Sequence, residues 1–240
     1  MNLVLLQPAD FEQAGSGDAS RVRLLGRRCE HVRRIHRAEV GDDLCVGLLG
    51  GKVGTGRILA LAPEQLDLSV SLVREPPKPL ALTLVVALPR PLVLKRVLLH
   101  ATTLGVKRIA LIHSRRVEKS YWQSSAVSPE SLTEPLLQGL EQARDTVLPR
   151  VSLHRRFRPF AEDELAGLLG DSRGFVAHPM ARLECPRGVA GPVTLTIGPE
   201  GGFNSFEVER LTEAGLESVR LGDRALRVEA AIPYAVARIS

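Results

Sequence analysis

Cysteine and histidine are scarce in this chain of 240 residues, and neither is arranged to hold a metal. The three cysteines, Cys29, Cys45 and Cys185, are odd in number and show no C-x-x-C spacing. Neither a disulfide framework nor a zinc site follows. The six histidines, among them His31 and His36, give no metal-ligand spacing. We therefore expect no bound metal and a reducing compartment, the cytosol.

Long apolar runs are also absent. No segment reaches the ~18 uninterrupted apolar residues that span a bilayer. The N-terminal MNLVLLQPAD has neither a basic lead nor a small-residue cleavage site, and we interpret it as a first strand rather than a signal peptide. We expect a cytoplasmic protein without a membrane partner. Its 44% hydrophobic residues suffice for a substantial core.

Aromatic residues make up only 4% of the chain, which argues against a stacking platform for single-stranded nucleic acid. The common nucleotide-binding loops are missing too. No G-x-G-x-x-G follows the first long strand, and GLLGGK at residues 47–52 has the wrong spacing for a P-loop and lacks its Ser or Thr. A phosphate-binding loop is therefore a poor explanation for any ligand site.

What the chain has in excess is arginine. The formal net charge is +5, and arginine, which outnumbers lysine, grips phosphate bidentately. A GC-rich genome would also enrich arginine, but it would not remove acids from particular stretches. One stretch with Glu30 as its only acid carries Arg21, Arg23, Arg27, Arg28, Arg33, Arg34 and Arg37. A second cluster holds Arg150, Arg155, Arg156 and Arg158. Clustered basic charge favours a polyanion such as RNA.

Two styles of sequence divide the chain. Residues 1–74 hold the short apolar segments LVLL, DDLCVGLL, VGTGRILAL and LDLSVSLV, with a helical stretch at 29–37, and predict a small β-barrel. The proline-rich residues 75–79 predict a stiff linker. In residues 80–240 the apolar runs LTLVVAL, RIALIH, GFVAHP, VTLTIG and SVRLG alternate with helical stretches at 92–104, 129–145, 162–169, 205–214 and 227–239. This alternation predicts an α/β domain with a parallel sheet covered on both faces.

The most informative segment is IGPEGGF at residues 197–203. We expect a strand that ends in a turn, in which Pro199 fixes φ and the glycines permit positive φ and close approach of a ligand. Asn204 or Ser205 is expected to cap the helix that follows. Further along, SVRL, Gly222 and DRALRVEAA repeat the arrangement. Two glycine-terminated strands that feed helices indicate a ligand held by backbone loops, although such glycines also occur in plain turns.

These residues resemble a known family. IGPEGGFNSFEVE followed by LGDRALRVEAA is similar to the C-terminal signature of the SPOUT methyltransferases, specifically the bacterial 16S ribosomal RNA uridine-N3 methyltransferases. That family reads IGPEGG-(F/L)-S-x-x-E and then LG-x-R-(I/V)-L-R-x-E-T-A. The resemblance extends upstream to ALPR, ATTLGV, S-x-R at 114–116, E-Q at 141–142 and H-P at 178–179, in the family's order.

The resemblance implies a fold and an activity. The N-terminal barrel would be PUA-like, a module that docks RNA. The C-terminal domain would have the SPOUT fold, whose last strands and helix thread a trefoil knot. It also implies S-adenosylmethionine (SAM) as methyl donor, ribosomal RNA in the 30S subunit as substrate, and a homodimer. Small apolar residues in the helix at 227–239 suit a dimer interface, but the same face could instead cover the sheet of its own subunit.

The resemblance also assigns residues. Backbone groups of residues 197–198 and 221–226 would hold adenine between apolar walls, and Glu200 would either fix its loop or partner a positive charge. The expected SAM-binding residues are His178, Ile197, Gly198, Pro199, Glu200, Gly201, Gly202, Leu221, Gly222, Ala225 and Leu226. The expected RNA-binding residues are the arginines of the first basic stretch together with Arg90 and Arg116.

Two residues are candidates for the chemistry. Uracil N3 carries a proton at neutral pH, so a group must remove it or stabilise the anion. Arg227 could stabilise an oxyanion on the base, and Glu229 could accept the proton or orient Arg227. The alternative is that the two form a structural ion pair at the start of a helix. His178 is likewise either a pocket residue or a structural one.

Several family positions differ in this chain. The motif threonine is Ala230, the acid of the T-E-L-G helix is Thr103, the lysine before it is His100, a basic residue is Val93, and an arginine comes early at Arg144. The SAM loops are intact, whereas residues expected to face RNA have changed. Two alternatives therefore stand beside uridine N3: a SPOUT enzyme that modifies another RNA nucleotide, and a non-catalytic RNA-binding protein on the same fold.

Overall fold

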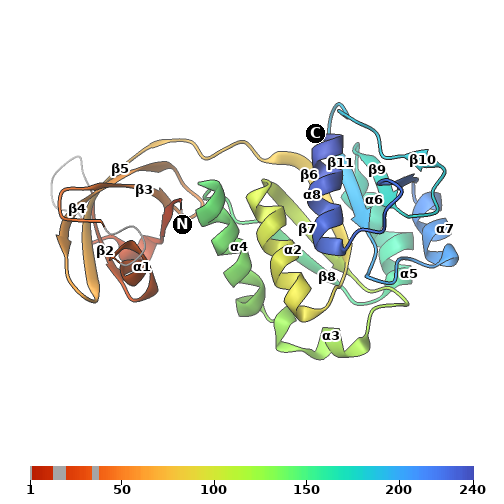
Figure 1. The fold of residues 1–240 in the computed structure, drawn as a ribbon, viewed down its shortest axis with the longest axis horizontal. Helices are drawn as coiled ribbons and strands as arrows, with labels where there is room; N and C mark the ends of the chain where they lie inside the picture. The colour runs from red at the N-terminus through yellow and green to blue at the C-terminus, as the bar shows by residue number, and fades with distance from the viewer. Residues whose placement is uncertain (1, 13–19, 34–37) are drawn as a thin grey trace. The chain divides into compact units, whose positions relative to one another are not determined.

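The computed structural model describes residues 2–12, 20–33 and 38–240, which form two compact units (Figure 1). The first unit comprises the chain up to Lys78 together with Leu140–Leu148. The second unit comprises Pro79–Gly139 and Pro149–Ser240. Each unit has its own sheet.

The first unit is built on one curled five-stranded sheet. Its elements are β1 (Val4–Leu6), η1 (Pro8–Asp10), β2 (Ser20–Leu25), α1 (Arg27–His31), β3 (Asp43–Leu48), β4 (Val53–Leu61) and β5 (Gln65–Arg74). The strand order is β1-β3-β4-β5-β2, with β1 and β3 parallel and the other pairs antiparallel. An isolated bridge between Phe11 and Val22 brings the chain after η1 back to β2. The sheet is therefore a half-barrel at the place where the sequence predicts a barrel.

The core of this sheet follows from the alternation of side chains along a strand. In β5, Leu66, Leu68 and Val70 are buried, and the residues between them are only partly so. This period of two places every second side chain on the inner face. Cys29 of α1 and the adjacent Val32 close the same cluster. The predicted helix at 29–37 overlaps α1, and its residues 34–37 lie outside the described residues.

Residues 140–148 belong to the first unit although the chain on either side belongs to the second. The Asn2 N–H donates to the Glu141 carbonyl at 3.1 Å, and the Gly50 N–H donates to the Thr146 carbonyl at 2.8 Å. Thr146 is fully buried, and a Cβ added to Gly47 would lie 2.6 Å from its Cγ2. The segment thus packs where β1 and β3 lie side by side.

The second unit contains a seven-stranded sheet whose pairs are all parallel. Its strands are β6 (Leu80–Ala87), β7 (Val106–Ile112), β8 (Arg150–His154), β9 (Arg173–Ala177), β10 (Leu183–Glu184), β11 (Val193–Ile197) and β12 (Leu216–Arg220). The order is β10-β12-β9-β11-β6-β7-β8. The central strand β11 is buried along its whole length, as its run VTLTI predicts for a sheet covered on both faces. The predicted parallel sheet is confirmed.

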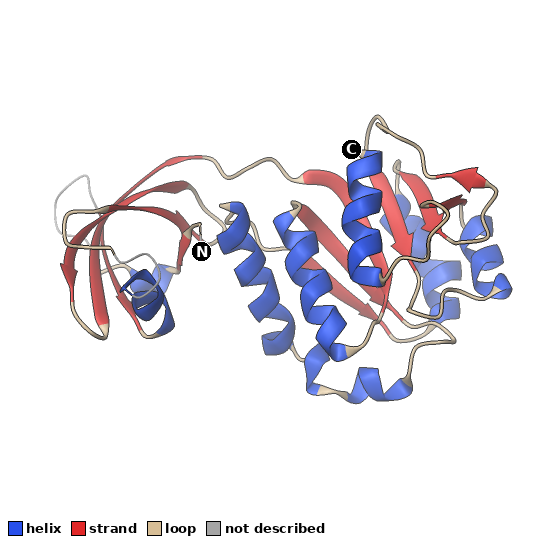
Figure 2. Ribbon diagram, in the orientation of Figure 1, coloured by secondary structure: helices blue, strands red, loops and turns tan. Residues whose placement is uncertain are grey.

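Helices cover both faces of this sheet, with α2 and α8 side by side in front of the strands and α6 behind them (Figure 2). The helices are α2 (Pro91–Thr103), α3 (Lys119–Gln123), η3 (Ser125–Val127), α4 (Pro129–Ala143), α5 (Phe157–Pro159), η4 (Phe160–Glu164), α6 (Leu165–Leu169), α7 (Ser205–Glu213) and α8 (Val228–Ile239). The predicted helices at 92–104, 129–145, 205–214 and 227–239 correspond to α2, α4, α7 and α8. The helix predicted at 162–169 begins earlier, with the π-helical turn η4.

Three edge strands escape the sequence prediction: the two-residue β10, and β2 and β8, which lie in arginine-rich stretches. In β2 the exposed Arg21 and Arg23 alternate with the buried Val22 and Leu24. In β8, Arg150 and its neighbours are exposed or half-buried, because the strand has a partner on one side only. Arginine-rich edge strands lack the continuous apolar run that marks a central strand. Both segments therefore look like basic surface in the sequence.

The apolar face of α8 is buried within the chain itself. Ala235 and Val236 are 0% and 4% exposed, and Ala231 is 6% exposed. The helix packs on α2 and β11 of its own unit. Of the two interpretations of this face, the structure therefore supports coverage of the chain's own sheet, and α8 no longer argues for a homodimer. The homodimer itself stays a prediction.

No helix among the described residues is long and apolar enough to cross a membrane.

Candidate functional site

A pocket of about 670 Å³ opens at the carboxyl edge of the parallel sheet. Its walls come from the ends of β9, β11 and β12, from the loops after β7, β9, β11 and β12, and from the first turn of α8. The lining residues are Arg116, 177–180, 197–203, 220–226, Val228 and Ala231. Every SAM-binding residue that the sequence predicts belongs to this set. The structure brings the two glycine loops together, and the binding role of their residues stays a prediction.

The turn after β11 requires glycine for two different reasons. Gly202 has φ of +72°, a conformation that glycine adopts without strain. Gly198 and Gly201 do not lie in that left-handed region, so positive φ is not what they supply. A Cβ added to Gly198 would lie 3.1 Å from the Phe203 backbone nitrogen, and one added to Gly201 would lie 3.0 Å from Cδ of Arg116. At these two positions glycine permits close packing against the pocket wall.

Two neighbouring loops hold this turn in place. The Arg90 N–H donates to Glu200 Oε1 at 3.2 Å. The Arg116 guanidinium donates to the Gly201 carbonyl. Glu200 is thus a loop-fixing acceptor, one of the two roles expected for it. Arg116 also lines the pocket, and the predicted contacts of Arg90 and Arg116 with RNA stay predictions.

A buried carboxylate joins the start of α7 to the loop after β7. Asn204 Oδ1 accepts the Glu207 N–H at 2.9 Å, and Glu207 Oε2 accepts the Asn204 N–H at 3.0 Å. This reciprocal capping box confirms Asn204 as the cap. Glu207 is 2% exposed, and its Oε1 accepts the Arg115 N–H at 2.7 Å. Glu207 was not among the predicted site residues, although its place as the glutamate of the S-x-x-E pattern could have revealed it.

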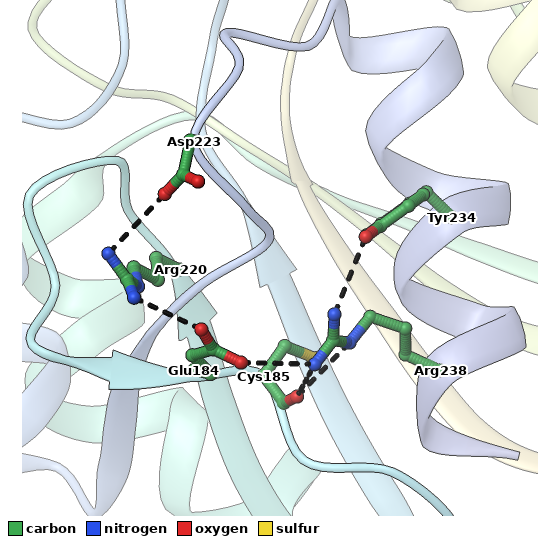
Figure 3. Close-up of polar contacts among 6 residues, drawn as sticks. All are labelled: Glu184, Cys185, Arg220, Asp223, Tyr234 and Arg238. Atoms are coloured by element: carbon green, nitrogen blue, oxygen red, sulfur yellow. Dashed lines mark hydrogen bonds and ion pairs between the residues drawn. The ribbon is translucent and has the colours of Figure 1, made fainter.

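The loop after β12 supplies a second wall of the pocket. Gly222 has φ of +143°, and a Cβ added to it would lie 3.9 Å from the Tyr234 hydroxyl. Arg220 Nη1 pairs with Asp223 Oδ1 at 3.5 Å (Figure 3). Arg220, Asp223 and Arg224 line the pocket, although the sequence did not predict them. Arg220 precedes the LG-x-R motif and Asp223 stands at its variable position, whereas Arg224 is the arginine of that motif and could have been predicted from it.

His178 reaches the pocket while it also makes structural bonds. Its N–H donates to the Val219 carbonyl at 2.9 Å, and its Nδ1 accepts the Met180 N–H at 3.3 Å. These bonds join the end of β9 to β12 and fix the turn at 178–180. His178 is therefore both a structural residue, which fixes the turn, and a pocket residue, which lines the cavity.

The candidate catalytic residues Arg227 and Glu229 do not belong to the pocket lining, although Val228 between them does. Arg227 is the N-cap residue of α8, and its carbonyl accepts the N–H groups of Ala230 and Ala231. Glu229 lies 3.8 Å from Arg96 on α2, with its side chain 18% exposed. The ion pair at this helix start therefore joins Glu229 to Arg96 rather than to Arg227. The catalytic roles of both residues stay predictions.

In the first unit, part of the predicted RNA-binding surface is already paired with acids. Arg28 forms a two-pronged ion pair with Asp10, at distances of 2.5 and 2.7 Å. Arg23 lies 2.8 Å from Asp67 and 3.0 Å from Glu12. The Arg23 hydrogen bond holds the pKa of Asp67 below its ordinary value. These acids come from other segments of the chain, so the local surplus of positive charge is smaller than the sequence of the stretch suggests.

Of the remaining arginines in the first basic stretch, the structure describes the side chains of only two. Arg21 and Arg33 are exposed. Arg34 and Arg37 lie outside the described residues, as does the side chain of Arg27. RNA binding by this stretch stays a prediction, and it rests mainly on the exposed pair.

The lining of the pocket suits a small organic ligand. Backbone polar groups, apolar side chains and the guanidinium groups of Arg116, Arg220 and Arg224 line it together. Within the described ranges, no three His, Cys, Asp or Glu side chains gather to hold a metal ion. A parallel sheet with a ligand pocket outside the carboxyl ends of its strands defines a class, the cofactor- and substrate-binding α/β domains.

Sequence comparison gives the family. Residues 76–240 match the model of the RNA methyltransferase domain. The chain belongs to this family of RNA methyltransferases. It is 30% identical over 242 residues to the ribosomal RNA small subunit methyltransferase E of Treponema pallidum, covering 96% of this chain and 87% of the relative.

Solved structures share the fold over the whole chain. A ribosomal RNA small subunit methyltransferase E from Neisseria gonorrhoeae, bound to SAM, gives a TM-score of 0.72 at 20% identity, with 99% of this chain and 95% of that chain covered. A putative methyltransferase from Legionella pneumophila, in complex with SAM, gives 0.69 at 19% identity, with 99% and 96% covered. The likeness confirms the α/β fold with its curled N-terminal sheet. The trefoil knot stays a prediction.

The buried carboxylate of Glu207 leads to a stability prediction. Glu207→Gln replaces one of two accepting oxygens with an NH₂ group that faces an N–H donor. We expect the free energy of unfolding, measured by urea denaturation, to fall by about 1–3 kcal/mol because a buried donor is left without its acceptor. Glu209→Gln, an exposed change on the same helix, should alter it by less than about 0.5 kcal/mol. Equal stabilities for the two variants would contradict the role given to Glu207.

Proposed function

We propose that this protein transfers a methyl group from SAM to N3 of a uridine in 16S ribosomal RNA. The observation that carries the proposal is the pocket at the carboxyl edge, because both glycine loops of the family signature line it. Membership in the RNA methyltransferase family supports the reaction type. The SAM-bound relatives of the same fold support the methyl donor.

The residues present fit SAM. Glycine at 198 and 201 lets this turn pack closely on Phe203 and Arg116, because an added Cβ would lie 3.1 and 3.0 Å from them, and the turn lines the cavity. Backbone groups of 197–198 and 221–226 would hold the adenine, with Ile197, Leu221 and Leu226 as apolar walls. A sulfonium is cationic and needs no phosphate cradle, which agrees with the missing P-loop. When bound, SAM supplies the methyl group that the base nitrogen accepts.

The protein's own part in the reaction is alignment and proton management. The pocket must hold donor and base in line for displacement at carbon. In our proposal Arg227 stabilises the negative charge that develops on the uracil oxygen, and Glu229 accepts the N3 proton. Arg96 lies 3.8 Å from Glu229 and would help to hold that carboxylate in place. The base would then approach the pocket past the start of α8, where both residues stand.

The substrate is expected to be large and polyanionic. Exposed Arg21 and Arg33 on the first unit would contact RNA phosphates, and Arg90 and Arg116 would do so near the pocket. We further propose that the enzyme acts in the cytoplasm on the assembled 30S subunit, and that it works as a homodimer. Sedimentation that shows a fully active monomer at micromolar concentration would remove the homodimer from the proposal.

One assay tests the proposed reaction. The protein is incubated with labelled SAM and 30S particles that lack the modification, and the labelled nucleosides of the 16S RNA are identified by mass. We expect N3-methyluridine as the labelled product. Label in another nucleoside would favour the alternative of a different RNA target, which the departures at Val93, His100 and Thr103 motivate. SAM binding without any label in the RNA would favour a non-catalytic RNA-binding protein.

The tight packing at Gly201 predicts a loss of SAM binding. A valine there would place its Cβ against Arg116 and its branched methyl groups in the turn. We expect Gly201→Val to raise the SAM dissociation constant, measured by calorimetry, by roughly tenfold or more. Gly167→Val on α6 is the matched control, because a Cβ at Gly167 meets nothing within 4 Å. An unchanged dissociation constant in folded Gly201→Val would remove this loop from the site.

The exposed arginines of the first unit predict a change in salt dependence. Removing one arginine–phosphate interaction should reduce the slope of log affinity against log salt by about one unit. We expect Arg21→Ala with Arg33→Ala to weaken binding of 16S RNA and to flatten its salt dependence accordingly. Arg57→Ala with Arg74→Ala, two exposed arginines of the same sheet outside the basic stretch, is the control of equal charge. Identical slopes for both double variants would show that the stretch does not dock the RNA.

A further inference from the structure

A chain of charged side chains runs from the last helix to the pocket. It comprises Arg238 and Tyr234 of α8, Glu184 of β10, Arg220 of β12 and Asp223 of the adjoining loop (Figure 3). The formal charges of its two arginines and two acids balance. Only its pocket end, Arg220 and Asp223, lines the cavity. Arg238 and Tyr234 do not belong to the lining, although the Tyr234 hydroxyl would lie 3.9 Å from a Cβ added to the lining residue Gly222.

At the helix end, Arg238 binds the segment that follows β10. Its Nη2 and Nε donate to the Cys185 carbonyl at 2.8 and 3.2 Å, and Nη2 lies 3.7 Å from Glu184. Its Nη1 donates to the Tyr234 hydroxyl at 3.4 Å. The backbone adds a further tie, because the Gly188 N–H donates to the Arg238 carbonyl at 2.9 Å. One guanidinium therefore fixes this segment against α8.

In the middle of this series of linked side chains, the segment that follows β10 holds β12 in place. Glu184 uses both of its carboxylate oxygens. Its Oε1 accepts a hydrogen bond from Arg220 Nη2 at 3.0 Å, and its Oε2 faces Arg238. The Cys185 N–H donates to the Arg220 carbonyl at 2.8 Å. Arg220 is thus gripped by its side chain and its backbone from one short stretch. The position of that stretch depends in turn on Arg238.

At the pocket end, Arg220 restrains the loop after β12 through Asp223. Its Nη1 lies 3.5 Å from Asp223 Oδ1, across Gly222. Gly222 has φ of +143° and carries no side chain that would restrict the loop. The backbone of 221–226 therefore depends on interactions made at its beginning and by its side chains.

The exposed fractions show which interaction matters most. The side chain of Arg238 is 17% exposed, whereas those of Glu184 and Asp223 are 64% and 91% exposed. Exposed ion pairs contribute little because water and salt screen them. A charged donor with two bonds to one sheltered carbonyl is stronger. Among these linked side chains, Arg238 is thus held most firmly, and the ion pair between Asp223 and Arg220 is the weakest interaction.

We infer that Arg238 is a positioning residue that sets the 221–226 wall of the cofactor pocket through Glu184 and Arg220. The inference rests on the proposed function, in which this wall holds part of SAM. It gives the last turn of α8 a role in methyl-donor affinity although no atom of Arg238 lines the pocket. The residue acts through Arg220 and touches neither donor nor base.

The test measures SAM affinity by calorimetry in Arg238→Gln, with Arg187→Gln as the control. Arg187 is an exposed arginine of the same connecting segment, so the net charge changes equally. We expect Arg238→Gln to raise the SAM dissociation constant by about fivefold, the scale of one ion pair. Arg187→Gln should leave it unchanged. Arg238→Lys, which keeps the charge near Glu184 but not the fork, should recover part of the affinity.

Non-additivity separates this role from a general loss of structure. Glu184→Gln removes the exposed link and should itself weaken SAM binding, and the double variant with Arg238→Gln should bind no more weakly than Arg238→Gln alone. Affinity for 16S RNA should be the same in all of these variants. An unchanged SAM dissociation constant in folded Arg238→Gln, or simple addition of the two effects, would overturn the inference. Absence of SAM binding in the parent protein would instead overturn the proposed function.

Discussion

The parallel direction of the seven strands is the constraint on which the site depends. Because β7, β9, β11 and β12 all run the same way, their carboxyl ends meet at one edge, and loops far apart in the sequence enclose one pocket there. Hydrogen bonds between the loops then fix the shape. The Glu207 carboxylate and the Arg116 guanidinium both tie the turn after β11 to the loop after β7. Bonds within the protein thus hold the pocket walls, and rigid walls lower the entropy cost of binding a ligand.

Charge along the sequence and charge on the surface are different quantities in this protein. The first basic stretch looks almost free of acids, yet Asp10 and Asp67 approach it from other segments and neutralise Arg28 and Arg23. The same is true at the pocket, where Glu184 and Asp223 balance the charge of Arg220. Several arginines, among them Arg28, Arg220 and Arg238, connect separate segments of the chain, which suits the planar fork of the guanidinium.

The sequence predicted what depends on local pattern. The apolar run of β11, the cap at Asn204 and the membership of both glycine loops in one pocket follow from period, spacing and family signature. What it missed depends on pairing across the fold. The edge strand β8 has no apolar run to reveal it, and the ion pair of Glu229 with Arg96 joins residues far apart in sequence. The apolar face of α8 is the plainest case, because composition cannot distinguish a face that covers its own sheet from one that covers a partner.

Residues 140–148 belong to the first unit, so each of the two units is built from two separate stretches of the sequence. A segment encoded inside the methyltransferase domain packs against the N-terminal sheet, with Thr146 next to Gly47. Cutting the chain at the proline-rich linker would thus remove the buried Thr146 and its neighbours from the first unit together with the whole second unit. Exchange of the N-terminal module between relatives, in evolution or by recombination in the laboratory, must carry two separate stretches of sequence. We therefore expect the two stretches to be inherited together, with substitutions in one matched by substitutions in the other.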